Sequence, residues 1–248
     1  MATGLTNKPG QNNCFLNSVV QVLYHLKPFR HSFNQLTAHA CSIPYCNFCA
    51  LKMLFIELEY GDGKVIEPLS LRLCLAQTFK NENRFQLNDT SDACECMEAV
   101  LSVLHGHLCY CHPEDVCEFA HCLTHKLFSM NIHEQVQCSC GIESQIKDYR
   151  QLVFRVVMHS FQYQTSVDAT RSFGHRLRLA VSNGELVRPC REGCGLEQKT
   201  MSVLTNKPSV VIIGLTWDSA APDVKHIRGF VSSISPTLLL SELFDEVS

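Results

Sequence analysis

The fifteen cysteines of this 248-residue chain constrain its fold most strongly, because many of them stand with histidines in short, spaced groups. The first group has the spacing H-x-C-x4-C-x2-C and consists of His39, Cys41, Cys46 and Cys49. Short loops that gather nitrogen and sulfur ligands suit tetrahedral zinc, and four protein ligands leave no open position. We therefore expect a structural zinc site at the start of a helix over residues 50–58. The alternative is four unrelated polar or buried residues.

A second group follows later in the chain and consists of His107, Cys117, Cys122 and His125. Its tight half has the spacing C-x4-C-x2-H, which again fits tetrahedral zinc. His105 competes with His107 for the fourth position. The alternative is a surface loop rich in histidine and cysteine, in which further residues could substitute as ligands: Cys109, Cys111, His112 and His121.

A separate cysteine, Cys14, stands where a turn-forming stretch meets a predicted helix. Asn, Lys, Pro, Gly and Gln precede it, and apolar residues then recur at helical spacing from Phe15 to Leu26. Unpaired N–H groups and the helix dipole favour a thiolate at such a position, and the thiolate is the nucleophilic form. These residues alone leave two alternatives open, a reactive thiol or one more small core residue.

Composition excludes several classes of protein. An apolar content of 46% is typical of a folded globular chain, and a net charge of −3 with scattered Lys and Arg argues against a nucleic-acid partner. The longest apolar run, residues 210–215, is too short to cross a bilayer, so we expect no membrane insertion. We expect an intracellular protein, cytoplasmic or nuclear, in which zinc rather than disulfides holds the grouped thiols.

The apolar pattern changes near residue 125. Helical spacing is typical of residues 15–26, 50–58 and 70–79 and of a helix capped by Asp92, whereas strand-like runs occur at 128–133, 152–158, 201–204 and 210–215. An α+β fold is therefore expected. Two knuckles lie in the β-rich half and contain Cys138, Cys140, Cys190 and Cys194.

The stretch around Cys14 resembles the cysteine box of the ubiquitin-specific proteases, GLxNxGNTCYMNSxLQ. It matches at Gly4, Leu5, Asn7, Gly10, Asn12, Cys14, Phe15, Leu16, Asn17, Ser18 and Gln21. Two additional residues precede the cysteine, so the loop reads PGQNNC, and the resemblance is to the divergent branch with a PGQN-type loop. A second segment resembles QxDAxEFxxxLLDxLH and matches at Asp92, Ala93, Glu95 and His105. Pro208 and the run 210–215 resemble a later strand of the family, although Trp217 and Asp218 replace its Arg-Phe pair.

This resemblance implies a single papain-like ubiquitin-specific protease domain over residues 1–248, with a helical thumb to residue 125 and β-rich palm and fingers over 126–248. Cys14 would be the nucleophile, and the side chain of Asn12 or Asn7 would help to hold the oxyanion. The two knuckles fall where the family's fingers bind zinc, although C-x-C replaces the usual C-x2-C, and the alternative is a decayed site. Because His105 aligns with a histidine found throughout the family, His107 is the expected ligand of the second group. Up to three structural zinc ions are expected.

The resemblance also implies deubiquitination, the thiol-dependent hydrolysis of the bond at ubiquitin's C-terminal glycine, with ubiquitin, polyubiquitin chains and ubiquitinated proteins as partners. The family's catalytic histidine follows a segment that residues 238–244 resemble, and the sequence stops at Ser248. We therefore expect a C-terminally incomplete domain that turns over little substrate on its own. The alternatives are an inactive ubiquitin-binding or scaffold protein and a zinc-stabilised interaction module unrelated to ubiquitin.

Overall fold

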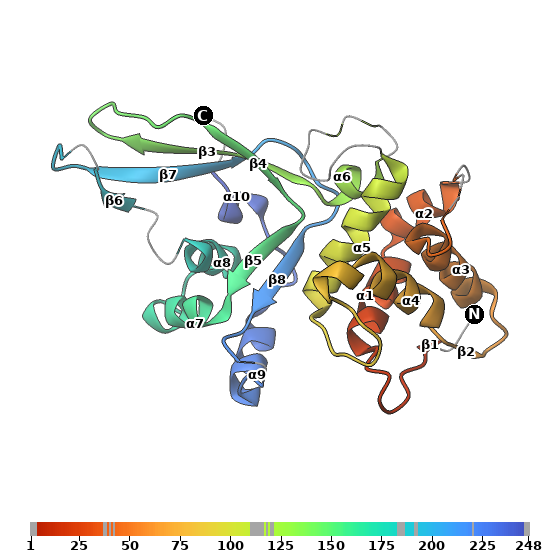
Figure 1. The fold of residues 1–248 in the computed structure, drawn as a ribbon. Helices are drawn as coiled ribbons and strands as arrows, with labels where there is room; N and C mark the ends of the chain where they lie inside the picture. Colours follow the sequence, from red (N-terminus) through yellow and green to blue (C-terminus); the bar gives the residue numbers. More distant parts are fainter. Residues whose placement is uncertain are drawn as a thin grey trace. The chain divides into compact units, whose positions relative to one another are not determined.

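The computed structural model describes residues 4–36, 39, 41, 43–109, 117, 119, 122–182, 187–190, 193–219 and 221–245 (Figure 1). The chain divides into two compact units, Met1–Leu127 and Phe128–Ser248. This division lies two residues from the expected limit of the helical part at residue 125.

The first unit is built mainly of helices. They are α1 (Cys14–His25), α2 (Lys27–Gln35), α3 (Asn47–Tyr60), α4 (Leu69–Thr78), α5 (Ala93–Leu108) and α6 (Leu123–Phe128), with a short 3-10 turn η1 (Lys80–Glu82). Strand β1 (Gly4–Leu5) pairs in parallel with β2 (Val65–Ile66). The helices predicted at 15–26, 50–58 and 70–79 correspond to α1, α3 and α4.

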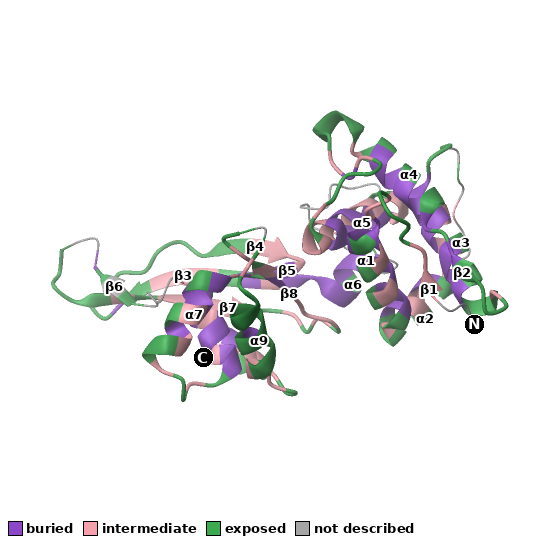
Figure 2. Ribbon diagram, turned by 90° about the horizontal axis from the view of Figure 1, so that it is seen from below, coloured by how far each residue is buried: buried purple, intermediate pink, exposed green. Residues whose placement is uncertain are grey.

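The core of this unit is formed by the apolar faces of α1, α3 and α5, which appear as purple bands in Figure 2. Helix α1 buries its stripe at Leu16, Val20 and Leu23, each 0% exposed, and packs against α2 and α5. On α2, the buried rings of Phe29 and Phe33 stack with their centres 5.4 Å apart. Such close-packed aromatic and aliphatic burial is the main source of stability in a domain of this size.

Local polar contacts decide where two of these helices begin. The side chain of Asp92 accepts a hydrogen bond from the N–H of Glu95 at 2.8 Å, so the predicted N-cap of α5 is confirmed. At α3 the N-cap is Cys46, whose sulfur accepts from the N–H of Cys49 at 3.4 Å. The first Cys/His group is therefore part of the start of α3, as expected.

The second unit contains two groups of strands. Strands β4 (Lys147–Gln151), β3 (Met130–Cys138), β7 (Glu197–Leu204) and β6 (Val187–Pro189) form an antiparallel sheet in that order, and β5 (Val153–Val157) pairs in parallel with β8 (Ile212–Thr216). The expected strand at 128–133 begins later, because Phe128 is the last residue of α6 and β3 starts at Met130. The alternation itself is observed, since Met130 and Ile132 are 0% and 2% exposed.

Helices also occur in this β-rich half, and the sequence pattern did not predict them. They are α7 (Met158–Val167), α8 (Phe173–Val181), α9 (Val224–Ser233) and α10 (Leu240–Leu243). Helix α8 packs against α7, β5 and α10, and it buries Phe173, Leu177 and Ala180, which have helical spacing. The apolar positions of these short helices join those of the strands in one hydrophobic cluster.

A membrane-spanning segment was not expected from the sequence. Within the described ranges, every helix is too short or too polar to cross a bilayer.

Candidate active site and metal centres

Cys14 is the first residue of α1, and its side chain is exposed. The loop before it is held by Asn7, whose Oδ1 accepts a hydrogen bond from the backbone N–H of Asn13 at 2.8 Å. Asn13 is 4% exposed and is the N-cap residue of α1, but its side chain makes no capping hydrogen bond to the described residues of the helix. The expected position of a thiol at a loop-to-helix junction is therefore observed, where the helix terminus favours negative charge.

The two asparagines predicted as oxyanion donors have different contacts. Asn12 adopts a left-handed backbone with φ +50°, and its Nδ2 donates to the carbonyl of Asn88 at 2.6 Å. Asn7 uses its carbonyl oxygen on the Asn13 N–H. Both contacts shape the loop around Cys14, and the choice between Asn7 and Asn12 as the oxyanion donor stays open.

Sequence reasoning missed one residue near this thiol, Arg72 on α4. It is 1% exposed, and its guanidinium carbon lies 4.5 Å from the centre of the Phe15 ring. Burial lowers the pKa of Arg72, while the nearby Cys96, Asp89 and Cys14 act in the opposite direction. The available signal was a single arginine inside the mostly apolar stretch LSLRLCLA of the predicted helix.

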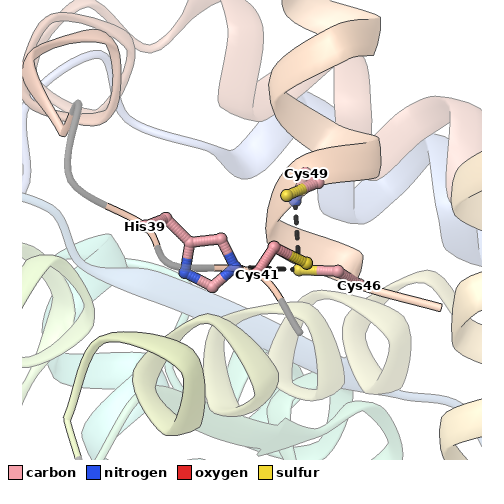
Figure 3. A group of neighbouring side chains, drawn as sticks. All are labelled: His39, Cys41, Cys46 and Cys49. Atoms are coloured by element: carbon pink, nitrogen blue, oxygen red, sulfur yellow. Dashed lines mark hydrogen bonds between the residues drawn. The ribbon is translucent and has the colours of Figure 1, made fainter. Parts of the chain in front are cut away.

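The first Cys/His group is assembled at the start of α3, as Figure 3 shows. The ligand atoms of His39, Cys41, Cys46 and Cys49 all lie within 4.8 Å of one another. The Nε2 atom of His39 is 3.1 Å from the sulfur of Cys46. Burial, together with Cys46 and Cys41, raises the pKa of Cys49 to about 12. Crowded thiols oppose one another's ionisation in this way, and a bound cation would reverse the effect.

The second group contains His105 instead of the expected His107. The ligand atoms of His105, Cys117, Cys122 and His125 lie within 4.8 Å of one another, and His105 Nδ1 is 3.2 Å from the sulfur of Cys122. The geometry favours His105 over His107 as the fourth donor. Residues two apart on a helix point in different directions, so α5 buries His105, at 0% exposed, and turns His107 elsewhere.

His107 packs instead beside the first group. The centre of the His107 ring lies 5.5 Å from that of the His39 ring in an edge-on arrangement. The ring of Phe48 also lies beside His39, with 4.5 Å between the two ring centres. Burial and the neighbouring His39 lower the pKa of His107. The last turn of α5 thus contributes a donor to the second group and a packing partner to the first.

Cys109 is a further thiol beside the second group. It is 2% exposed, and burial together with hydrogen-bond contacts to Cys122 and Cys117 raises its pKa. It is thus one of the residues that the sequence left open as a substitute ligand. The others, Cys111, His112 and His121, lie outside the described residues.

The third group lies at the ends of strands in the second unit. The sulfur atoms of Cys138, Cys140, Cys190 and Cys194 lie within 4.8 Å of one another, with 3.7 Å between Cys138 and Cys194. Both knuckles make the same tight turn, because Gly141 N–H donates to the Cys138 carbonyl and the N–H of Gly193 to the Cys190 carbonyl. The short C-x-C spacing therefore does not keep the four thiols apart.

Comparison with known proteins places these features in a family. The sequence model described as "Ubiquitin carboxyl-terminal hydrolase" matches residues 3–227. The chain belongs to this family. Ubiquitin carboxyl-terminal hydrolases of this type are cysteine-type deubiquitinases, so the family resemblance inferred from the cysteine box is confirmed.

Curated relatives match over nearly the whole chain. Ubiquitin carboxyl-terminal hydrolase 54 of Rattus norvegicus is 40% identical over 253 residues, which cover 99% of this chain and 16% of that protein. Ubiquitin carboxyl-terminal hydrolase 53 of Homo sapiens is 36% identical over 252 residues, which cover 99% of this chain and 23% of that protein. The chain therefore spans less than a quarter of the length of these relatives.

Solved structures confirm the fold. The SAGA DUB module of Ubp8, Sgf11, Sus1 and Sgf73 bound to monoubiquitin matches with a TM-score of 0.59 and 18% identity, covering 86% of this chain and 47% of the matched chain. The same module bound to ubiquitin aldehyde matches with a TM-score of 0.57 and 19% identity, covering 86% and 46%. The α+β fold expected from the sequence is that of the ubiquitin carboxyl-terminal hydrolase family.

Proposed function

We propose that this chain acts as a thiol-dependent deubiquitinase domain in which Cys14 is the nucleophile. The observation that carries the proposal is the position of Cys14, an exposed thiol on the first residue of α1 within the family's cysteine box. The Cys14 sulfur would attack the carbonyl carbon of ubiquitin's C-terminal glycine. The amine would then leave with a proton, and water would hydrolyse the resulting thioester.

Ubiquitin, polyubiquitin chains and ubiquitinated proteins are the partners that we infer. Family membership supports this, and so does the fold shared with modules whose structures contain monoubiquitin or ubiquitin aldehyde. We also place the protein inside the cell, in the cytoplasm or nucleus, because grouped thiols of this kind persist in a reducing compartment.

We further propose that each of the three Cys/His groups holds one structural zinc ion. The donor sets are sulfur with nitrogen in the first two groups and sulfur alone in the third, which are the sets that tetrahedral zinc prefers. The single domain with a helical thumb and β-rich palm and fingers remains our interpretation, with the third group at the fingers. Zinc in these groups would contribute to folding rather than to the reaction.

A ubiquitin molecule carrying a thiol-reactive group at its C-terminus tests the role of Cys14. Labelling requires a docked ubiquitin and a reactive thiol, and it does not depend on the proton transfers that complete turnover. We expect one covalent adduct on the wild-type chain, located at Cys14 by mass spectrometry of peptides. Cys14→Ser should remove the adduct.

A second cysteine provides the matched control. Cys94 is partly exposed and lies outside the three groups, so Cys94→Ser should leave labelling unchanged. An adduct that persists in Cys14→Ser would overturn the assignment of the nucleophile. Ubiquitin affinity without labelling of the wild-type chain would instead indicate a non-catalytic ubiquitin-binding protein.

A further inference from the structure

Arg72 is a charged side chain in the core of the first unit, directly under the residue that follows Cys14. It lies on α4, is 1% exposed, and places its guanidinium 4.5 Å from the centre of the Phe15 ring. Guanidinium groups keep their charge in proteins, and a buried charge is strongly unfavourable unless it is compensated. The position of Arg72 therefore calls for a compensating partner.

The hydrogen bonds of Arg72 hold the segment of residues 83–89, which contacts the cysteine box. Its Nη2 donates to the carbonyls of Gln86 at 2.5 Å and Asp89 at 2.8 Å. Between them lies Asn88, whose carbonyl accepts from Asn12 Nδ2 at 2.6 Å. Arg72 thus reaches the loop before Cys14 through one intervening residue.

This segment has an unfavourable backbone that needs such support. Three of its residues have positive φ angles: Asn83 at +53°, Phe85 at +54° and Asn88 at +67°. Left-handed backbone is strained for residues other than glycine, particularly for a bulky one such as phenylalanine. The two hydrogen bonds from Arg72 help to keep the segment in this conformation.

The remaining donors of Arg72 have no partner within the described chain. Its Nε and Nη1 atoms are buried and make no hydrogen bond there. The ionisable groups that face the guanidinium are Cys14 from α1, Asp89 from the held segment and Cys96 from α5. Burial raises the pKa of Cys96 to about 12, so Cys96 stays a neutral thiol. The groups within electrostatic reach that can offset the charge of Arg72 are therefore Asp89 and Cys14.

We propose that Arg72 is a positioning residue of the Cys14 site, which fixes the segment bound to Asn12 and whose positive charge favours the Cys14 thiolate. The proposal rests on the proposed function of Cys14, which it deepens. Arg72 acts from beneath the helix start, on the side away from solvent, so its charge is screened less than that of a surface residue.

Alkylation of Cys14 by iodoacetamide tests this role without ubiquitin. The reagent is uncharged, and mass spectrometry of the Cys14 peptide separates its reaction from that of other thiols. Arg72→Met removes both the positive charge and the two hydrogen bonds that hold the segment bound to Asn12, so it should slow alkylation of Cys14 at pH 7 by about tenfold. Arg72→Lys keeps the charge and should restore most of the rate.

The control is Arg30→Met, which removes another arginine of the first unit that lies over an aromatic ring, that of Tyr24 at 4.9 Å. Its rate should equal that of the wild type. A wild-type rate in Arg72→Met, or equal rates in Arg72→Met and Arg72→Lys, would overturn the proposal.

A second variant keeps the test independent of core packing. Asp89 is exposed, and Asp89→Asn removes the carboxylate that competes for Arg72 while keeping the backbone carbonyl. We expect Cys14 to react about twofold faster, since exposed charges act weakly, and an unchanged or slower rate would contradict the proposal. Failure of the ubiquitin probe alongside these alkylation rates would refute the deubiquitinase function and leave the role of Arg72 intact.

Discussion

At the scale of single residues, three asparagines shape the loop around Cys14 through their side-chain hydrogen bonds. Asn7 accepts from the Asn13 N–H, Asn12 donates to Asn88, and Asn17 Nδ2 donates to the carbonyl of Thr6 at 2.9 Å. Asparagine suits this work because its amide both donates and accepts, and because it tolerates left-handed backbone. The two-residue insertion before Cys14 is therefore accommodated by specific hydrogen bonds.

The first prediction concerns Asn7. Asn7→Ala should lower the free energy of unfolding of the first unit by about 1–2 kcal/mol, because a nearly buried N–H of Asn13 loses its acceptor. Asn7→Asp is the matched control, since it keeps an acceptor oxygen and adds a charge that the helix terminus favours. Urea unfolding followed by circular dichroism measures the difference. Equal destabilisation by both variants would show that the acceptor is not what matters.

Part of the site was predictable at this scale, and part was not. Cys14 was placed correctly because turn formers and helical spacing are local signals on either side of it. His107 was preferred over His105 on the family resemblance, whereas the rotation of α5 decides which of the two faces the group, and it brings His105 there. Arg72 gave only a weak local signal, a single arginine in a mostly apolar stretch, since its role depends on the carbonyls of Gln86 and Asp89, which chain folding brings to it.

At the scale of elements, a single carboxylate joins a strand, a helix and the segment after α10. The Oδ2 of Asp245 accepts from the backbone N–H of Ser202 on β7 at 2.9 Å and from Arg178 on α8 at 2.5 Å, and its Oδ1 accepts from Lys199 at 3.2 Å. Its side chain is 8% exposed. Several charge-assisted hydrogen bonds at a buried carboxylate make this junction important for the second unit.

The second prediction follows from the ionisation of Asp245. Burial alone would raise its pKa, but Arg178, the Ser202 N–H and Lys199 outweigh burial and hold the pKa below its ordinary value. A lowered folded-state pKa means that the carboxylate stabilises the fold above the unfolded value of about 3.9, and that this stability is lost as the pH falls through the folded value.

Asp245→Asn should therefore destabilise the second unit by about 2 kcal/mol at pH 7, and the difference from the wild type should shrink below about pH 4. Urea unfolding at a series of pH values measures it. Glu197→Gln, at an exposed position of β7, is the control and should change stability by less than about 0.5 kcal/mol. A difference that stays constant down to the acid range would show that the charge of Asp245 is not responsible.

Elements with strong local patterns were predicted, and elements defined by distant contacts were not. The cap at Asp92 and the alternation at Met130 and Ile132 are visible in a few residues of sequence. Helices α7 to α10 were missed because each is ten residues or shorter and is stabilised by packing on strands, such as α8 on β5. Short helices of this kind have little pattern of their own.

At the scale of the whole molecule, the three Cys/His groups are distributed unequally between the units. Two lie in the first unit and one lies in the second. Because metal binding is coupled to folding, each unit should depend on its own ions.

The third prediction is a zinc content of three ions per chain, measured by elemental analysis of purified protein. Cys122→Ser should remove one ion, since its sulfur contacts both His105 and His125, and Cys194→Ser should remove another. His107→Gln should retain all three. Loss of an ion in His107→Gln but not in His105→Gln would restore the ligand set first expected from the sequence.

The close fit at Gly174 has a consequence for how the chain is made. A methyl group at Gly174 would lie 2.7 Å from the Cβ of Glu242 and from a methyl of Leu238. The packing around α8 therefore forms only when residues more than sixty positions later in the chain are in place. Leu243 and Phe244, 2% and 4% exposed, belong to the same core, and Asp245 bridges to β7. Because domains generally fold as units during synthesis, we expect the first 127 residues to fold on the ribosome before the second unit, which needs Asp245 to complete its contacts.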